Sequence, residues 1–211
     1  MSARVRAKIC GLTRIEDVHL AVTLGADAVG FIFWPESPRV VNVEQARHLA
    51  VRVPAFVSRV GVFVNLPPRD VALIAADVGL DVVQLHGEES PSDYAGIGRR
   101  LMKSVSLPDA EAIEEIARWP EQVMPLVDSY DRVRRGGTGR VANWPHAAAL
   151  AARRPIVLAG GLKPENVADG IRAVRPWAVD VSSGVEASPG IKSGERLRAF
   201  LGAVDAENGR S

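Results

Sequence analysis

The sequence has a single cysteine, Cys10, and aromatic residues make up only 5% of its 211 residues. One cysteine cannot form an internal disulfide, it excludes a zinc site built from four thiolates, and it fits a reducing compartment. No window holds 18 uninterrupted apolar residues, and the first residues lack the apolar core of a signal peptide. We therefore expect a cytoplasmic protein without a membrane span.

The sequence also lacks an excess of charge of one sign. Lys and Arg total 26 and Asp and Glu total 25, which gives a net charge of +1, so we expect no nucleic acid or membrane partner. The four histidines are scattered, and no glycine-rich dinucleotide motif follows the first strand. We expect no metal and no cofactor. A small phosphorylated substrate is still compatible, because one pocket can be basic on a neutral protein.

A regular alternation of β-rich and amphipathic segments fills the chain. The predicted strands are 7–10, 28–33, 58–64, 81–86, 101–106, 123–128, 155–160 and 178–183. The predicted helices are 14–25, 42–53, 67–79, 90–98, 109–119, 144–154, 163–174 and 193–204, of which 90–98 is the weakest. Nearly continuous apolar strands are typical of parallel strands buried on both faces. Eight β-then-α units predict a single α/β domain over residues 1–211, a (β/α)8 or TIM barrel. An open doubly wound sheet is the alternative.

Two strand ends carry groups suited to proton transfer, since sites in such barrels form where the strands end. Lys8 and Cys10 share a face of the first strand, and a cation below the thiol favours the thiolate. The alternative for Cys10 is a small buried hydrophobic residue. Asp128 closes the sixth strand, and burial raises the pKa of such a carboxyl, as a general acid requires. The alternatives for Asp128 are a helix cap or a salt bridge to a nearby arginine.

Four more polar side chains end strands and are candidate substrate ligands. Arg39 lies in a Pro-flanked loop after the second strand, and its guanidinium suits a planar carboxylate. Gln84 and His86 share a face at the end of the fourth strand, and Asp180 lies near the end of the eighth. The alternatives are a surface arginine, polar groups that close the barrel rim, and a rim salt bridge.

Glycine-bearing turns follow the seventh and eighth strands, where barrel enzymes commonly bind phosphate. We expect Gly160, Gly161, Ser183 and Gly184 to bind a phosphate through backbone N–H groups, because glycine lets the backbone approach a ligand closely. The basic, glycine-rich loop 134–140 is a weaker candidate for an anion contact, and an ordinary turn is its alternative.

Several motifs in this order closely resemble the phosphoribosylanthranilate isomerase family. They are KICGLT (8–13), GFIFWPESPR (30–39), GVFVN (61–65), QLHGEE (84–89), LVDS (126–129), GGTG (136–139), LAGGLKPENV (158–167) and VDVSSGVEASPGIK (179–192). The resemblance is specific because separate motifs recur at separate strand ends across nearly the whole chain. One departure follows GGTG, where the family usually has an aromatic residue and then Asp-Trp. This chain has Ala142 and Asn143 there, and Asn143 can still cap a helix.

The resemblance implies an Amadori rearrangement in tryptophan biosynthesis, from N-(5-phosphoribosyl)anthranilate to 1-(2-carboxyphenylamino)-1-deoxyribulose 5-phosphate. It makes Asp128 the general acid that protonates the ring oxygen and opens the furanose. It makes Cys10 the general base that takes the C2 proton. Arg39 would engage the anthranilate carboxylate, and the two glycine turns would bind phosphate.

Other readings stay open at this point. A Schiff-base aldolase would use Lys8 or Lys103, a metal-dependent epimerase would group histidine and carboxylate ligands at strand ends, and a non-catalytic binder can share the fold. An enzyme that also serves histidine biosynthesis would have acidic residues where Cys10 and Ser106 stand. The sequence leaves open whether the chain is a monomer or a homodimer.

Overall fold

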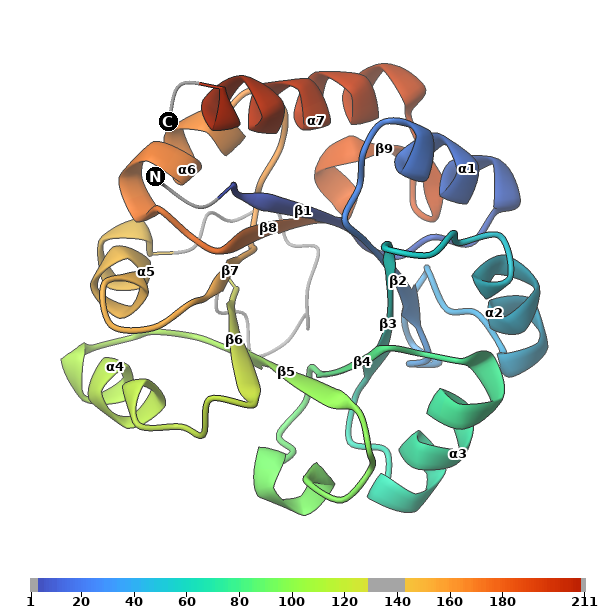
Figure 1. The fold of residues 1–211 in the computed structure, drawn as a ribbon, viewed down its shortest axis with the longest axis horizontal. Coiled ribbons are helices and arrows are strands. Elements are labelled where there is room, and N and C mark those ends of the chain that lie inside the picture. Colours follow the sequence, from blue (N-terminus) through green and yellow to red (C-terminus); the bar gives the residue numbers. More distant parts are fainter. Residues whose placement is uncertain (1–3, 129–142, 210–211) are drawn as a thin grey trace.

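The computed structural model describes residues 4–128 and 143–209. Within them, eight parallel strands close into a barrel in the order of the sequence, and the last strand pairs with the first (Figure 1). The predicted (β/α)8 barrel is confirmed, and the open-sheet alternative is wrong. The barrel strands are β1 (Arg6–Ile9), β2 (Ala28–Ile32), β3 (Ser58–Phe63), β4 (Val82–Leu85), β5 (Arg100–Val105), β6 (Val123–Val127), β7 (Val157–Leu158) and β8 (Ala178–Val181).

Helices surround the barrel and bury its outer face (Figure 1). They are α1 (Ile15–Thr23), α2 (Val43–Ala50), α3 (Pro68–Val78), α4 (Ala110–Ala117), α5 (Trp144–Ala151), α6 (Val167–Val174) and α7 (Gly194–Asn208). Their ends follow local signals in the sequence. Asn42 forms a capping box with Gln45 at the start of α2, and Gly79 ends α3 with a φ of 71°. None of the helices in the described residues is long and apolar enough to cross a membrane.

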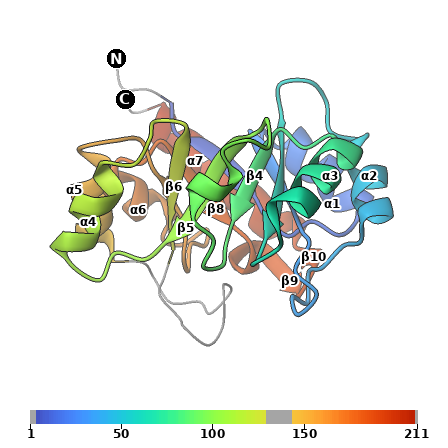
Figure 2. The ribbon, with the colours of Figure 1, turned by 90° about the horizontal axis from the view of Figure 1, so that it is seen from below.

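Two parts of the chain differ from the prediction. The segment 90–98 forms only a 3-10 turn, η1 (Pro91–Tyr94), and a cavity of about 1130 Å³ lies beside it, lined in part by β5 and by Trp119. After β8, a second 3-10 turn, η2 (Ser183–Val185), leads into an antiparallel hairpin, β9 (Glu186–Ser188) and β10 (Ile191–Lys192), which the sequence analysis did not predict. The hairpin lies at the edge of the barrel opposite the chain ends (Figure 2).

The first strand and the last helix are joined by a two-way amide contact. Asn208 Oδ1 accepts from the Val5 N–H at 2.8 Å, and Asn208 Nδ2 donates to the Val5 carbonyl at 3.1 Å. This contact satisfies the backbone just before β1 and holds α7 against the strand that closes the barrel.

We expect Asn208→Ala to lower the free energy of unfolding by about 1–2 kcal/mol, because two hydrogen bonds are lost and the Val5 backbone loses its partners. Urea unfolding followed by circular dichroism measures the change. Asp205→Ala, on an exposed position of the same helix, is the control and should stay within about 0.5 kcal/mol of the wild type. Equal effects of the two substitutions would contradict the assignment.

Candidate active site

The proposed acid and base both stand at the carboxyl edge of the barrel, because each directly follows a barrel strand, β6 and β1 respectively. The β9–β10 hairpin is seen from the side in Figure 2. Cys10 directly follows β1, and its N–H donates to the Val181 carbonyl at 2.9 Å. Asp128 directly follows β6, and its N–H donates to the Val105 carbonyl at 3.0 Å. The two residues therefore continue the ladders of their strands and are held by the barrel itself.

Cys10 is packed against β2 and is only 5% exposed. A Cβ added to Gly30 would lie 2.8 Å from Cys10 Sγ and 3.3 Å from Lys8 Cε. Glycine at position 30 therefore makes room for both side chains. As predicted, Lys8 and Cys10 lie on the same face of the first strand.

The resting form of Cys10 is the neutral thiol. Burial raises the pKa of Cys10 above its ordinary 9.0, the charge of Asp180 adds to this, and the positive charges of Lys8 and Lys192 oppose it without cancelling it. Burial lowers the pKa of Lys8, but Asp180, whose Oδ1 lies 2.8 Å from Lys8 Nζ, and to a lesser extent Cys10 together more than reverse this and keep the ammonium charged. Lys8 thus acts on the thiol with the predicted sign, yet the expected thiolate is not the resting state.

Gln84, His86 and Asp128 form a chain across the mouth of the barrel. Gln84 Nε2 lies 3.1 Å from His86 Nδ1, and His86 Nε2 lies 3.7 Å from Asp128 Oδ2. Burial lowers the pKa of His86 despite the opposing charge of Asp128, so the ring is neutral near pH 7. A ring that accepts from Gln84 at Nδ1 carries its proton on Nε2, toward Asp128. Gln84 is 1% exposed and supports His86 from inside the barrel.

Arg39 is an ion-paired residue of the rim, and the surface-arginine alternative is wrong. Its side chain is 12% exposed, and its Nε and Nη2 donate to the two carboxylate oxygens of Glu186 at 2.8 and 2.7 Å. These hydrogen bonds raise the pKa of Arg39. A Cβ on Gly11, whose φ is 71°, would lie 2.6 Å from Arg39 Cδ. The arginine stem therefore crosses the turn that follows Cys10.

Asp180 and the two barrel lysines are ion-paired with one another or with neighbours. Asp180 is 9% exposed and is held by Lys8, so the salt-bridge alternative describes it and the predicted contact with a substrate hydroxyl or amine is not supported. Lys103 Nζ donates to the Gly87 carbonyl at 2.6 Å and to Glu89 Oε2 at 3.2 Å. Ion-paired ammonium groups do not provide the neutral amine that a Schiff-base aldolase requires.

The turns after β7 and β8 touch each other. Gly160 and Gly161 have φ values of 77° and 64°, which only glycine adopts without strain. A Cβ on Gly184 would overlap the Leu162 carbonyl oxygen. Among the described residues, the N–H groups of Gly160, Gly161, Ser183 and Gly184 donate to no other group. Adjacent turns with unpaired N–H groups are typical of anion sites, so phosphate binding by these four residues stays a prediction.

Some predictions fall on residues 129–142, which lie outside the described part of the chain. These are the loop 134–140, the departure at Ala142, and the arginines considered as partners of Asp128. Asn143 is described, and its Oδ1 accepts from the His146 N–H at 3.2 Å at the start of α5. The expected helix cap at Asn143 is therefore confirmed.

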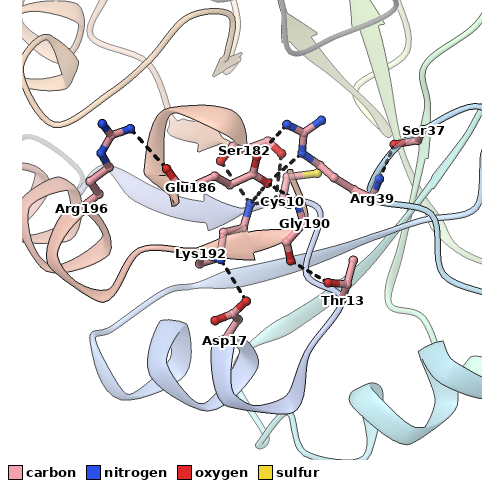
Figure 3. Close-up of polar contacts among 10 residues, drawn as sticks. All are labelled: Cys10, Thr13, Asp17, Ser37, Arg39, Ser182, Glu186, Gly190, Lys192 and Arg196. Carbon is pink, nitrogen blue, oxygen red and sulfur yellow. Dashed lines mark hydrogen bonds and ion pairs between the residues drawn. The ribbon is translucent and has the colours of Figure 1, made fainter. Parts of the chain in front are cut away.

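Sequence reasoning assigned no role to the side chains of the hairpin, although the structure brings them to Cys10. Figure 3 shows Glu186 and Lys192 beside Cys10 and Arg39. Lys192 Nζ donates to the Cys10 carbonyl at 2.7 Å and to Glu186 Oε1 at 2.8 Å. The Pro-Gly pair at 189–190 was the available signal, because it marks a turn that places Glu186 opposite Lys192.

A closed parallel barrel with titratable groups and two adjacent glycine-bearing turns at its carboxyl edge is typical of (β/α)8-barrel enzymes that act on phosphorylated ligands. In the described residues, no three His, Cys, Asp or Glu side chains gather in a way that could hold a metal ion.

Comparison with known proteins assigns the chain to one family within this class. The family model for N-(5'phosphoribosyl)anthranilate (PRA) isomerase matches residues 7–203. The enzyme of this name from Pelobacter propionicus is 46% identical over 197 residues, 93% of this chain and 94% of the relative, and the one from Pseudomonas fluorescens is 46% identical over 205 residues, 97% and 100%. The chain belongs to the PRA isomerase family.

Solved structures agree with this assignment. Phosphoribosyl anthranilate isomerase from Thermotoga maritima superposes with a TM-score of 0.88 at 40% identity, covering 96% of this chain and 99% of that one. A second structure, with a TM-score of 0.85, 40% identity and the same coverage, holds reduced 1-(o-carboxyphenylamino)-1-deoxyribulose 5-phosphate.

The raised pKa of Cys10 gives a direct prediction for thiol reactivity. Alkylation of Cys10 by iodoacetamide, followed by mass spectrometry, should rise with pH to a midpoint above 9.0 in the folded protein, because the raised pKa leaves less thiolate at any pH. The urea-denatured chain is the control and should show a midpoint near about 8.5. Midpoints are compared rather than rates, since burial slows the reaction at every pH. A folded midpoint at or below the denatured one would contradict the assignment.

Proposed function

We propose that Cys10 and Asp128 perform the two proton transfers of the PRA isomerase reaction, which this chain catalyses in tryptophan biosynthesis. The proposal is carried by one observation: both groups are fixed at the same barrel edge by their strands, with a neutral His86 against Asp128 and a charged Lys8 beneath Cys10. The reaction is an aldose-to-ketose isomerisation, and it needs one acid and one base.

The reaction starts at Asp128. Its carboxyl protonates the ring oxygen of the phosphoribosyl group, the C1–O bond breaks, and the nitrogen lone pair forms a protonated Schiff base. His86, with its Nε2 proton toward Asp128, orients the carboxyl. Cys10 then removes the C2 proton, the electrons neutralise the Schiff base, and the resulting enolamine tautomerises to the aminoketone.

The positive charge of the intermediate explains how Cys10, a neutral thiol at rest, can act as a base. The protonated Schiff base places a new cation beside Cys10, and a nearby cation lowers the pKa of a thiol. It acts in the same direction as Lys8 and Lys192. Once the ring has opened, the thiol releases its proton to water, and the thiolate then takes the C2 proton and becomes a neutral thiol again. This dependence on the cation orders the two proton transfers.

The two ends of the substrate are held at opposite sides of the reacting carbons. The free N–H groups of Gly160, Gly161, Ser183 and Gly184 bind the 5-phosphate, and Arg39 binds the anthranilate carboxylate. Residues 1–211 act as one domain in this proposal, without cofactor or metal. Because Cys10 must remain a free thiol, a reducing compartment such as the cytoplasm suits the enzyme.

Cys10→Ala and Asp128→Asn should each lower kcat by about 10²–10⁴-fold or more, because each removes one positioned proton-transfer group. A fluorescence assay that follows consumption of phosphoribosylanthranilate measures the loss, and circular dichroism checks folding. Asp70→Asn, an exposed carboxylate at the start of α3, should keep full turnover. If a folded Cys10 or Asp128 variant kept close to the wild-type rate, its role would be wrong.

We further propose that the amino-end face of the barrel joins two copies of the chain. Phe56, just before β3, is fully exposed with a φ of 71°, and Val51 is 75% exposed. The first residues of several strands and Trp177 line a cavity of about 200 Å³ at this end. Exposed apolar surface of this kind marks interfaces. Phosphoribosylanthranilate isomerase from Thermotoga maritima, 39% identical, is described as dimeric.

Phe56→Ser should shift the chain from dimer to monomer, because it removes the most exposed apolar side chain of this face. Light scattering coupled to size-exclusion chromatography reports the mass against the 22.6 kDa chain. Leu73→Ser, 61% exposed on α3, serves as the control and should leave the mass unchanged. A wild-type monomer at high micromolar concentration would refute the proposal.

A further inference from the structure

The β9–β10 hairpin contributes two buried charged side chains to which the proposed chemistry assigns no contact with the substrate. The side chain of Lys192 is 0% exposed and that of Glu186 is 5% exposed. Charges are costly to bury unless they are paired and hydrogen-bonded. These two charged groups lie next to Cys10, the proposed base, and next to Arg39, which is proposed to bind the substrate carboxylate. Their position points to a role in the site.

Glu186 fixes the orientation of Arg39. Its Oε1 accepts from Arg39 Nε and its Oε2 accepts from Arg39 Nη2, so the carboxylate binds the guanidinium through two parallel hydrogen bonds. Figure 3 shows Glu186 beside Arg39. This fork occupies one edge of the guanidinium and leaves Nη1 on the other side. A guanidinium held in this way presents its remaining N–H groups in one direction.

Lys192 fixes Glu186 in turn. Its Nζ donates to Glu186 Oε1 at 2.8 Å, to the Cys10 carbonyl at 2.7 Å and to the Ser182 carbonyl at 3.1 Å. Three acceptors around one Nζ match the three protons of an ammonium, and the charge of Glu186 opposes the burial that lowers the pKa of Lys192. The carboxylate that holds Arg39 is thereby tied to the backbone of the residue proposed as the base.

The arginine stem is fixed at its other end by the turn after β1. Gly11 has a φ of 71°, and a Cβ there would lie 2.6 Å from Arg39 Cδ. The Arg39 backbone N–H also donates to Ser37 Oγ at 3.2 Å. Both the stem and the head of Arg39 are therefore constrained relative to Cys10.

We propose that Glu186 is a positioning residue that makes the site selective for a carboxylated aromatic amine, by presenting the Nη1 edge of Arg39 to the substrate carboxylate. The inference rests on the proposed function, in which Arg39 binds that carboxylate. Without Glu186, the guanidinium regains its rotamer freedom, and ordering it again costs binding free energy.

Charge alone predicts the opposite outcome, which makes the test sharp. Glu186→Gln removes a negative charge beside Arg39, so a purely electrostatic effect would strengthen the binding of a carboxylate. Loss of positioning weakens it. The sign of the change therefore separates the two effects.

The experiment titrates wild type and Glu186→Gln calorimetrically with two probes. One is reduced 1-(o-carboxyphenylamino)-1-deoxyribulose 5-phosphate, and the other is the same molecule without the carboxyl group. The wild type should prefer the carboxylated probe by about tenfold or more, as expected for a charge-assisted hydrogen bond. Glu186→Gln should lose most of this preference through weaker binding of the carboxylated probe, with the affinity for the other probe nearly unchanged.

Arg39→Lys tests whether Glu186 acts through Arg39. This variant alone should remove the preference, since lysine lacks the guanidinium fork. Adding Glu186→Gln to it should change the preference no further, because the two residues then form one coupled unit. If Glu186→Gln does not fold, Glu186→Asp keeps the charge opposite Lys192 but is one methylene shorter, and it should lose the preference in the same way.

Three outcomes would overturn the proposal. These are equal weakening for both probes, an unchanged preference, or a stronger one in a folded Glu186 variant. A wild type that does not distinguish the probes would show instead that Arg39 does not bind the carboxylate. That result would also remove the basis of the inference, while turnover that depends on Cys10 and Asp128 would still stand.

Discussion

The buried ion pair between Lys8 and Asp180 is the constraint on which the site depends. The two residues are register partners across β1 and β8, the pair of strands that closes the barrel, and their side chains are 3% and 10% exposed. Removing one partner of a buried pair leaves an uncompensated charge, at a cost of about 3–5 kcal/mol. The Lys8–Asp180 ion pair therefore supports barrel closure and fixes the position of the Lys8 ammonium beside Cys10.

Sequence reasoning located the candidate acid, base and ligand-binding residues and missed the side chains that hold them in place. Cys10 and Asp128 were predictable because apolar strand runs end at them and parallel strand ends meet at one edge. The turns at 160–161 and 183–184 were predictable from glycine. The partner of Arg39 was not, since Glu186 lies 147 residues away and pairing at that separation is set by the fold. The protonation state of Cys10 also depends on burial, which local sequence does not report.

The helices and strands also differ in how far local sequence determines them. The cap at Asn42 and the end of α3 at Gly79 follow local chemistry, and the predicted helices 42–53 and 67–79 begin and end at these two residues. The segment 90–98 lacks a clear helical pattern and forms only the η1 turn. The barrel still closes without a full helix between β4 and β5, because these two strands pair in register. Closure therefore depends on the strands more than on any one covering helix.

The surroundings of position 10 also explain why a thiol suits the role of base. Asp180 stands close enough to raise the pKa of Cys10, and a Cβ added at Gly30 would lie 2.8 Å from Cys10 Sγ, so the thiol depends on a glycine at that position. A carboxylate at position 10 would face Asp180 as a like charge, and two adjacent carboxylates hold a shared proton instead of ionising together. A neutral thiol rests beside Asp180 without repulsion and ionises only when a cation arrives. In the proposed mechanism, the buried pair that closes the barrel therefore also favours a thiol over a carboxylate as the base at position 10.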